Sequence, residues 1–328
     1  MSSPTASPAS SVRAHGPSAL GGSVRRFVEL TLTLARTDFK LRYFGSALGY
    51  FWQLARPLLF FGVIYIAFTK IFDVDKGVPH YGVYLLTGIV LWTFYGEATG
   101  NAISSLTARE PLLRKVRFPR LAIPIAVTLT SVFNLLMNSI AVIVFALANG
   151  VYPSLSWLWM LPIILGFIII ALGTGMLLSA LYVRYRDVQP IWEVTLQILF
   201  YATPIMYPAY KFKSLEHIAL LNPFAMMLTQ MGYAFVHPGR IATKVAAAVS
   251  ALHPGTIAVR VGGKLVLHPG TVATITRAHT VYTVPMRSAA AASGGALHVA
   301  IAIAIIPLVF ALGLWYFHRE APRFAENL

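Results

Sequence analysis

Long apolar segments separated by short polar loops form the main pattern along the chain. Each of six segments approaches the length of about 20 helical residues that crosses a hydrocarbon core of about 30 Å. They comprise residues 48–72, 81–106, 121–147, 157–182, 191–207 and 296–317. The pattern predicts an all-α integral membrane protein with six transmembrane helices.

The basic residues predict the orientation of these helices. Five cations at residues 25–42 precede the first apolar segment, which places the N-terminus in the cytoplasm, and six crossings return the C-terminus to the same side. Both predicted inner loops and the C-terminal end are basic, whereas the short outer loop at residues 149–156 carries no cation. We therefore expect a multi-pass membrane protein with both termini in the cytoplasm.

The fifth segment is short and is interrupted by Pro204. Residues 215–236 behind it are apolar but do not follow a short basic loop. A broken helix followed by a re-entrant outer segment fits this arrangement, because irregular backbone survives at membrane depth where protein or a water-filled cavity satisfies its polar groups. A proline kink followed by an ordinary outer helix is the alternative.

Three regions flank this membrane domain, which is expected over residues 45–236. Residues 1–22 are rich in Ser, Ala, Pro and Gly and predict a disordered cytoplasmic tail. Residues 23–44 contain apolar positions at helical spacing opposite basic ones, which is typical of an amphipathic helix at the inner membrane interface. Residues 291–328 contain the sixth segment and the cytoplasmic C-terminus.

Residues 237–290 differ in composition and are expected to form a small, β-rich extracytoplasmic insertion. Residues 256–261 and 264–268 flank Gly262 and Gly263 and read as a β-hairpin. A near-repeat places His253 and His268 in similar His-Pro-Gly-Thr stretches, but no carboxylate accompanies them. We favour a plain outer cap over a metal site and expect no metal on this chain.

Composition narrows the class further. The chain has 328 residues, of which 57% are hydrophobic and 11% charged, well below the roughly 25% charged residues of an ordinary soluble domain. Most of the cations behind the net charge of +15 border apolar segments, so they indicate orientation and contact with anionic lipid rather than with nucleic acid. The absence of cysteine excludes a thiol nucleophile and a cysteine-ligated metal.

Residues 38–52, immediately before the first span, carry an acid, spaced basic residues, Arg-Tyr, Ser-Ala-Leu-Gly and Trp. This stretch resembles the permease subunits of ABC type-2 exporters that move lipid-linked polysaccharides such as O-antigen, teichoic acid and galactan. Residues 112–120, residues 182–188 and Asn222-Pro223 match the same family in the right order. The chain departs from the family at residues 109–111, where Asn is frequent, and at the insertion.

The resemblance implies a homodimer that forms the membrane path while two separate ATPase subunits bind ATP and Mg and supply the energy. The sequence independently calls for such a partner, because Gly262-Gly263-Lys264 lacks the first glycine of a phosphate-binding loop. We expect no cofactor and no enzymatic activity on this chain itself.

Family likeness also implies the coupling segment, which docks on the ATPase. The alternative, that its cations only bind lipid headgroups, leaves Pro111-Leu112-Leu113 unexplained. The coupling segment comprises Arg109, Glu110, Pro111, Leu112, Leu113, Arg114 and Lys115. Further candidates for the cytoplasmic interface are Asp38, Lys40, Arg42, Tyr43, Arg184, Arg186 and Asp187.

Candidates for the substrate path are aromatic residues and one cation at membrane depth. Aromatic faces stack on sugar rings, and Arg suits a diphosphate, but an interfacial aromatic belt and a snorkelling Arg explain the same residues. For Glu97, which lies among small residues, an interhelical hydrogen bond is the commoner role. The path candidates are Arg56, Tyr65, Trp92, Tyr95, Tyr201 and Tyr207.

The sequence thus predicts the permease of an ATP-driven exporter of a polyprenyl-diphosphate-linked polysaccharide, with membrane lipids and a second copy of itself as further partners. A drug or simple-lipid exporter of the same fold is the nearest alternative. A secondary transporter would need coupling carboxylates near the midplane and internal repeats. A glycosyltransferase would need a cytoplasmic acidic site, which Asp187 alone does not make.

Overall fold

A computed structural model describes the membrane-domain helices and four strands of the chain. The predicted tail at residues 1–22 lies outside the described residues, as does most of the insertion outside the strands. The described ranges are 24–43, 49–72, 80–115, 119–207, 209, 216–236, 256–261, 264–269, 272–277, 280–285 and 296–324.

The helices follow the predicted apolar segments closely. The N-terminal helix α1 spans Val24–Tyr43, and the first span consists of α2 (Gly49–Ile66) with a π-helical end, η1 (Ala67–Ile71). The remaining long helices are α3 (Tyr81–Ile103), α5 (Ala122–Ala148), α6 (Met160–Arg184), α7 (Val188–Ala202), α9 (Pro223–Val236) and α12 (Ala296–Glu320). Short helical pieces are η2 (Thr107–Arg109), α4 (Glu110–Lys115), η3 (Leu155–Trp159), α8 (Glu216–Ala219) and η5 (Ala321–Arg323).

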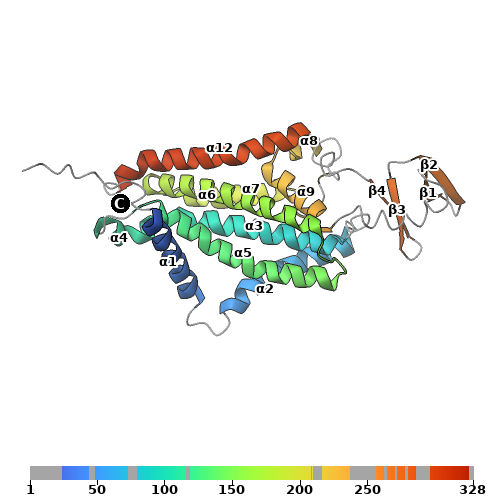
Figure 1. The fold of residues 1–328 in the computed structure, drawn as a ribbon, viewed down its shortest axis with the longest axis horizontal. Coiled ribbons are helices and arrows are strands. Elements are labelled where there is room, and N and C mark those ends of the chain that lie inside the picture. The colour runs from blue at the N-terminus through green and yellow to red at the C-terminus, as the bar shows by residue number, and fades with distance from the viewer. Residues whose placement is uncertain are drawn as a thin grey trace, which may run out of the picture.

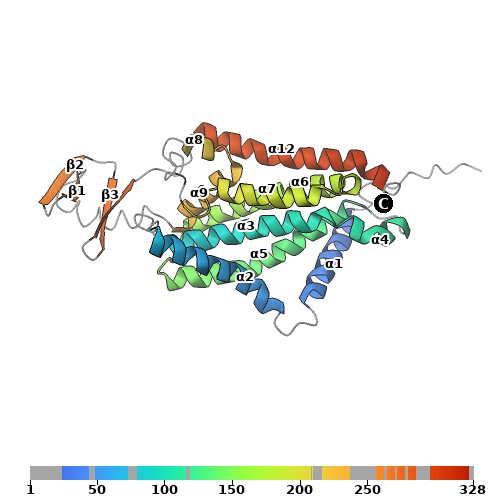
Figure 2. The same cartoon turned by 180° about the vertical axis from the view of Figure 1, so that it is seen from behind.

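Helix α3 forms the centre of the bundle. It packs against α5 on one side and α6 on the other, and most of its residues from Tyr81 to Ile103 are buried. Figures 1 and 2 show α3, α5, α6 and α12 running roughly side by side along the long axis. Helix α3 therefore lies in the core and contacts protein on most of its surface.

Helices α6 and α12 approach each other closely at two glycines. A Cβ atom on Gly173 would lie 2.5 Å from the Cα of Phe310, and a Cβ atom on Gly313 would strike the backbone of Gly173. Small residues permit such close contact between apolar helices, where dispersion forces and hydrogen bonds replace the hydrophobic effect as the source of association.

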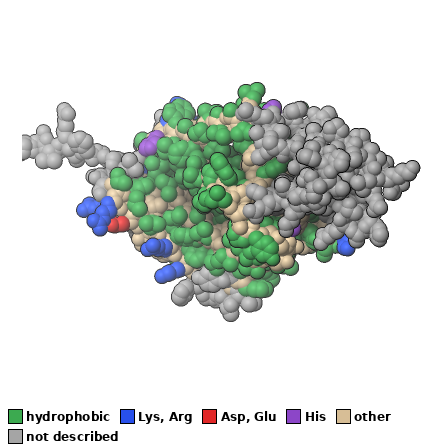
Figure 3. Space-filling view, turned by 45° about the vertical axis from the view of Figure 1, so that its right-hand side comes forward, with side chains coloured by type: hydrophobic (Ala, Val, Ile, Leu, Met, Phe, Trp, Pro, Cys, Tyr) green, Lys and Arg blue, Asp and Glu red, His purple; other side chains and the backbone are tan. Residues whose placement is uncertain are grey.

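The two ends of the bundle differ in character. The helices α1 and α4 and the C-terminal end of α12 lie at one end, and the strands lie beyond the other end (Figure 1). Figure 3 shows a broad hydrophobic surface along the bundle, with Lys and Arg side chains gathered toward one end. This is the arrangement of a protein whose apolar middle lies in lipid and whose charged end lies outside the hydrocarbon core.

By length and composition, four helical segments in the described part of the chain are apolar enough to cross a membrane. They are Phe51–Ile71, Ala122–Ala148, Leu155–Arg184 and Leu297–Glu320. The chain is therefore a multi-pass membrane protein. Helix α3 is long but enclosed by its neighbours, and α7, with 15 residues, reaches about 22 Å at a rise of about 1.5 Å per residue. Four candidate spans stand where the sequence predicted six.

The strands form two antiparallel pairs. Strand β1 (Thr256–Val261) pairs with β2 (Lys264–Pro269), with Val259 opposite Val266, at the position where the hairpin was predicted. Strand β3 (Val272–Arg277) pairs with β4 (Thr280–Pro285), with Ile275 opposite Tyr282. The second pair had not been predicted.

Candidate functional site

The candidate coupling segment is a short helical hook at the basic end of the bundle. It consists of η2 and α4, with Glu110 in the first turn of α4 and Pro111 directly after it. A proline is tolerated there because the first helical N–H groups have no intrahelical partner. Ala108 and Pro111 are exposed, whereas Arg109 and Glu110 are half-buried.

Leu113 anchors this hook to the bundle. Its side chain is 8% exposed and belongs to a cluster that also contains residues from the C-terminal halves of α6 and α12. The buried members of the cluster are Leu106, Leu113, Leu121, Ile123, Met176, Ala180, Val183, Phe317 and Phe324. Leu113 therefore holds the coupling segment in place from within the permease. The side chains of Leu112, Arg114 and Lys115 lie outside the described part.

Helix α1 is bound to the bundle by one face. Ala35 is fully buried, its carbonyl accepts a hydrogen bond from the hydroxyl of Thr130 in α5 at 3.3 Å, and Phe39 meets Phe133 edge to face. Asp38 on this helix forms an ion pair with Arg109 of the coupling segment. Two of the predicted interface residues are thus brought together, although they lie 71 positions apart.

One turn further along α1, Arg42 reaches Glu97 in α3. Its guanidinium donates to the Glu97 carboxylate at 2.5 Å, and the amide of Asn134 in α5 donates to the same oxygen at 2.5 Å. The amide of Gln53 in α2 lies 3.4 Å from the other carboxylate oxygen. The carboxylate of Glu97 in α3 therefore binds side chains from α1, α2 and α5. This agrees with the interhelical hydrogen bond expected for Glu97.

The remaining cytoplasmic candidates lie on exposed surface. Lys40 is exposed on α1, and the side chain of Tyr43 is outside the described part. The guanidinium of Arg184 lies 5.3 Å from the ring centre of Tyr185, and that of Arg186 lies 5.0 Å from the ring centre of Tyr182. Asp187 is exposed at the N-terminal end of α7, where its negative charge interacts favourably with the positive end of the helix dipole.

The path candidates divide into exposed and enclosed residues. Arg56, Tyr65 and Tyr201 are exposed on α2 and α7, and Tyr207 is half-buried. Trp92 and Tyr95 are 9% and 3% exposed, and both pack against Phe224 of α9. Both side chains are thus enclosed within this protomer, and their assignment to the path stays a prediction.

The break after α7 is held by side chains from α3 and by the start of α9. The hydroxyls of Tyr84 and Tyr81 donate to the carbonyls of Pro204 and Met206, each at 2.7 Å. The amide of Asn222 donates to the hydroxyl of Thr203 at 2.9 Å, and its carbonyl oxygen accepts from the backbone N–H of Phe224 at 3.0 Å. Asn222 and Pro223 therefore lie at the start of α9, and Asn222 also holds the non-helical backbone that follows α7 at Thr203.

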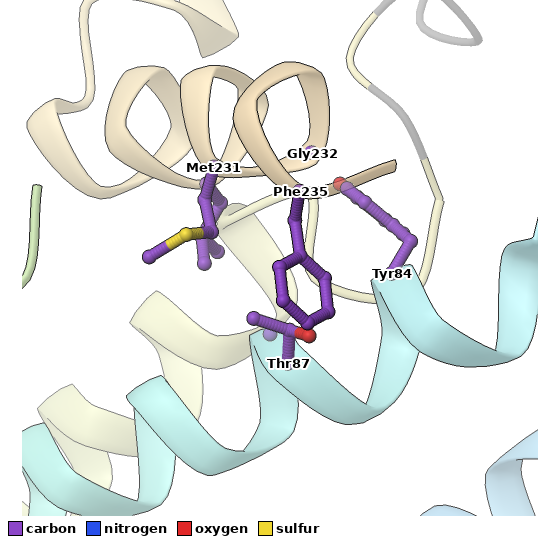
Figure 4. Close-up of a pocket in the computed structure, with 7 residues that line it drawn as sticks. Tyr84, Thr87, Met231, Gly232 and Phe235 are labelled. Carbon is purple, nitrogen blue, oxygen red and sulfur yellow. The ribbon is translucent and has the colours of Figure 1, made fainter. Parts of the chain in front are cut away.

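A small pocket lies between α3 and α9. Tyr84, Thr87 and Gly88 line it from α3, and Leu228, Met231, Gly232 and Phe235 line it from α9. Figure 4 shows Phe235 pointing from α9 toward Thr87. The hydroxyl of Thr87 is bonded to the carbonyl of Val83 in its own helix at 2.7 Å, so the wall offers mainly apolar contact.

The polar contacts of Gln53 and Asn134 were missed at the sequence level. Both are polar residues within predicted apolar segments, and such residues face protein rather than lipid. That signal could have identified Asn134 as a partner of Glu97. Within the described part of the chain, no group of three or more His, Asp or Glu residues is arranged to hold a metal ion.

Long apolar helices around an enclosed central helix, with a basic hook at one end, define a multi-pass transporter-type membrane subunit. The sequence model of the ABC-2 type transporter family matches residues 29–236, which run from within α1 to the end of α9. The chain therefore belongs to the ABC-2 type transporter family, as the resemblance implied, and it is a transmembrane rather than a catalytic subunit.

Three curated relatives carry the same description. Two are O-antigen export system permease proteins RfbA of Klebsiella pneumoniae, and one is that of Myxococcus xanthus. The first is 32% identical over 202 residues, covering 61% of this chain and 77% of the relative. The second is 31% identical over 211 residues, covering 64% and 81%. The Myxococcus xanthus protein is 29% identical over 203 residues, covering 61% and 77%.

Proposed function

We propose that this chain is the permease subunit of an ATP-driven exporter that moves a polyprenyl-diphosphate-linked polysaccharide to the outer face of a bacterial cytoplasmic membrane. The observation that carries the proposal is the similarity to three O-antigen export permeases over 202, 211 and 203 residues. ATP and Mg are bound by a separate ATPase subunit, and two copies of the permease form the path.

The topology in this proposal has six crossings. Helix α3 is the second, and its 23 residues reach about 34 Å, enough for a core of about 30 Å. Because protein surrounds it, α3 tolerates polar residues such as Glu97 and Asn101. Helix α7 is the fifth crossing, completed by the tethered backbone after it, with α8 and α9 as the re-entrant segment. Both termini are then cytoplasmic, and the strands lie outside.

The coupling segment transmits the work of the ATPase. The hook is anchored by Leu113 and presents Ala108 and Pro111 outward, which is the form expected of an element that enters a groove on another subunit. Exposed Lys40, Arg184, Arg186 and Asp187 lie near the same end and add charged contacts, to the ATPase or to lipid headgroups.

The test is purification of the permease together with the ATPase encoded beside it, followed by reconstitution with a lipid-linked glycan extract. A complex of two plus two subunits, with ATP-dependent movement of the glycan lipid to the other leaflet, supports the proposal. A permease that purifies without any ATPase, or a complex that moves no glycan lipid, contradicts it.

A matched pair of leucine variants tests the coupling segment separately. Leu113→Ala removes a buried anchor, which costs about 2–5 kcal/mol locally, so the hook should detach and ATPase binding should weaken. Leu41→Ala, at a position 70% exposed on α1, serves as the control. Equal ATPase binding by the two variants would remove the docking role from residues 109–115.

A further inference from the structure

Five residues on one face of α1 contact the bundle or pack beside it. Phe27, Thr31, Ala35, Asp38 and Arg42 follow one another at three- and four-residue steps, which places them in one stripe along a helix. Thr31 and Ala35 in the middle of the stripe are buried. Asp38, which is half-buried, and Arg42, whose side chain is 36% exposed, continue this stripe at its C-terminal end.

The stripe carries one acid and one cation, and each forms an ion pair with a residue of opposite charge outside α1. The acid Asp38 binds the cation Arg109, and the cation Arg42 binds the acid Glu97. Both partners belong to one continuous stretch of chain, α3 followed by the coupling segment, which α1 meets in antiparallel order. Each ion pair is partly shielded, with side chains between 19% and 36% exposed.

This pattern distinguishes one register of α1 from its neighbours. A shift of α1 by one turn, about 5.4 Å, toward α3 would bring Asp38 to Glu97, and the attraction would become repulsion between two acids. Opposed charges in fixed order thus favour one alignment and disfavour the adjacent one. Two such pairs hold α1 against rotation as well as against sliding.

We propose that the Asp38–Arg109 and Arg42–Glu97 pairs lock α1 in register against α3 and the coupling segment, with Glu97 as the positioning residue that passes movement of the coupling segment to the membrane helices. This inference rests on the proposed function for what drives the movement. Glu97 is suited to the role because Gln53 of α2 and Asn134 of α5 contact the same carboxylate. A displacement of α1 therefore reaches three membrane helices through one side chain.

The lock can be measured in the permease without its ATPase. The chain has no cysteine, so spin labels can be placed at the exposed positions Val28 and Ser104 alone, with labelled protein diluted by unlabelled chain. Double electron–electron resonance should give a narrow distance distribution. Arg42→Glu should broaden or shift the distribution, and Arg42→Glu with Glu97→Arg should restore it. Arg25→Gln, which breaks the exposed Arg25–Glu29 pair on the same helix, is the matched control.

The consequence for transport is measured as glycan lipid exported per ATP hydrolysed. Arg42→Gln and Glu97→Gln should each lower this ratio about five-fold or more, and the charge exchange should recover it, whereas Arg25→Gln should not change it. If the exchange variant does not accumulate, Asp38→Arg with Arg109→Asp makes the same test at the cytoplasmic pair.

Recovery of both the distance and the export ratio supports the inference. An unchanged distance in the single variants, or an exchange that recovers neither quantity, overturns it. A wild-type chain that binds no ATPase and exports nothing contradicts the proposed function instead, and the distance measurement still decides whether α1 is locked.

Discussion

The hydroxyl of Tyr84 in α3 donates a hydrogen bond to the carbonyl of Pro204, 2.7 Å away, at the point where α7 has ended. Backbone outside a helix has lost its own hydrogen-bond partners, and at membrane depth water does not replace them. Tyr81, one turn earlier, does the same for the carbonyl of Met206. The backbone that follows α7 is thus held by its neighbour α3.

Replacing Tyr84 with Phe should loosen this break. The change leaves the Pro204 carbonyl without its donor, at a cost of about 1–3 kcal/mol for a buried acceptor. Hydrogen–deuterium exchange of residues 203–207 should increase, and Tyr81→Phe should add to the effect. Tyr152→Phe, at a position 69% exposed, is the control. Unchanged exchange in both Tyr81 and Tyr84 variants would mean that the break is fixed by Asn222 and packing alone.

Gly313→Ala should disrupt the contact between α6 and α12. The added methyl group has no room, because it would meet the Gly173 backbone, which a side-chain adjustment cannot relieve. We expect a loss of about 1–3 kcal/mol or more, seen as a lower unfolding temperature in detergent or as failure to accumulate. Gly62→Ala, with no atom within 4 Å of the added Cβ, is the control and should be tolerated.

The positions of the long helices could be predicted from the sequence because each apolar segment must match the thickness of the bilayer. Helix α3 begins at Tyr81, and α12 begins at Ala296, as the hydropathy pattern predicted. The amphipathic helix, predicted over residues 23–44, spans Val24–Tyr43, and Arg42 near its end finds a partner in Glu97.

The site was predicted less completely, because burial depends on which helices become neighbours. Trp92 is an aromatic residue of the kind expected on a glycan path, but in the structure Phe224 of α9 packs against its ring. Leu113 belongs to a motif expected to dock outward, yet it is buried in one cluster with Phe317 and Phe324, which come more than two hundred residues later. No local pattern contains those contacts. The pairing of Asp38 with Arg109 was beyond sequence reasoning for the same reason.

Substitutions at Trp92 and Tyr201 should separate core residues from path residues. Trp92→Ala leaves a cavity in an aromatic cluster and should cost about 3–5 kcal/mol of stability. Tyr201→Ala, at a position 63% exposed, should change stability by less than about 0.5 kcal/mol but lower glycan export if Tyr201 contacts the sugar. Thermal unfolding and export are measured on both variants. If Trp92→Ala has normal stability but has lost export, Trp92 is a residue of the substrate path.

Arg56 should bind the diphosphate of the substrate. It lies on the exposed stripe of α2 formed with Leu59 and Val63, whose exposures are 62% and 69%, so its cation faces the surroundings of the protomer. Guanidinium groups bind phosphate through two parallel hydrogen bonds. A hydrogen bond to a charged group contributes about 1.5–3 kcal/mol to the binding free energy. Arg56→Gln should therefore lower export about ten-fold or more, since 1.4 kcal/mol corresponds to ten-fold.

Arg56→Lys distinguishes this role from simple anchoring in lipid. Lysine also snorkels to headgroups but cannot make the bidentate contact, so export should stay well below that of the unaltered chain although the protein inserts normally. Arg25→Gln controls for loss of one positive charge. Full export by Arg56→Lys would assign Arg56 to the membrane interface, and the diphosphate would then need another partner along the exposed face of α2 or α7.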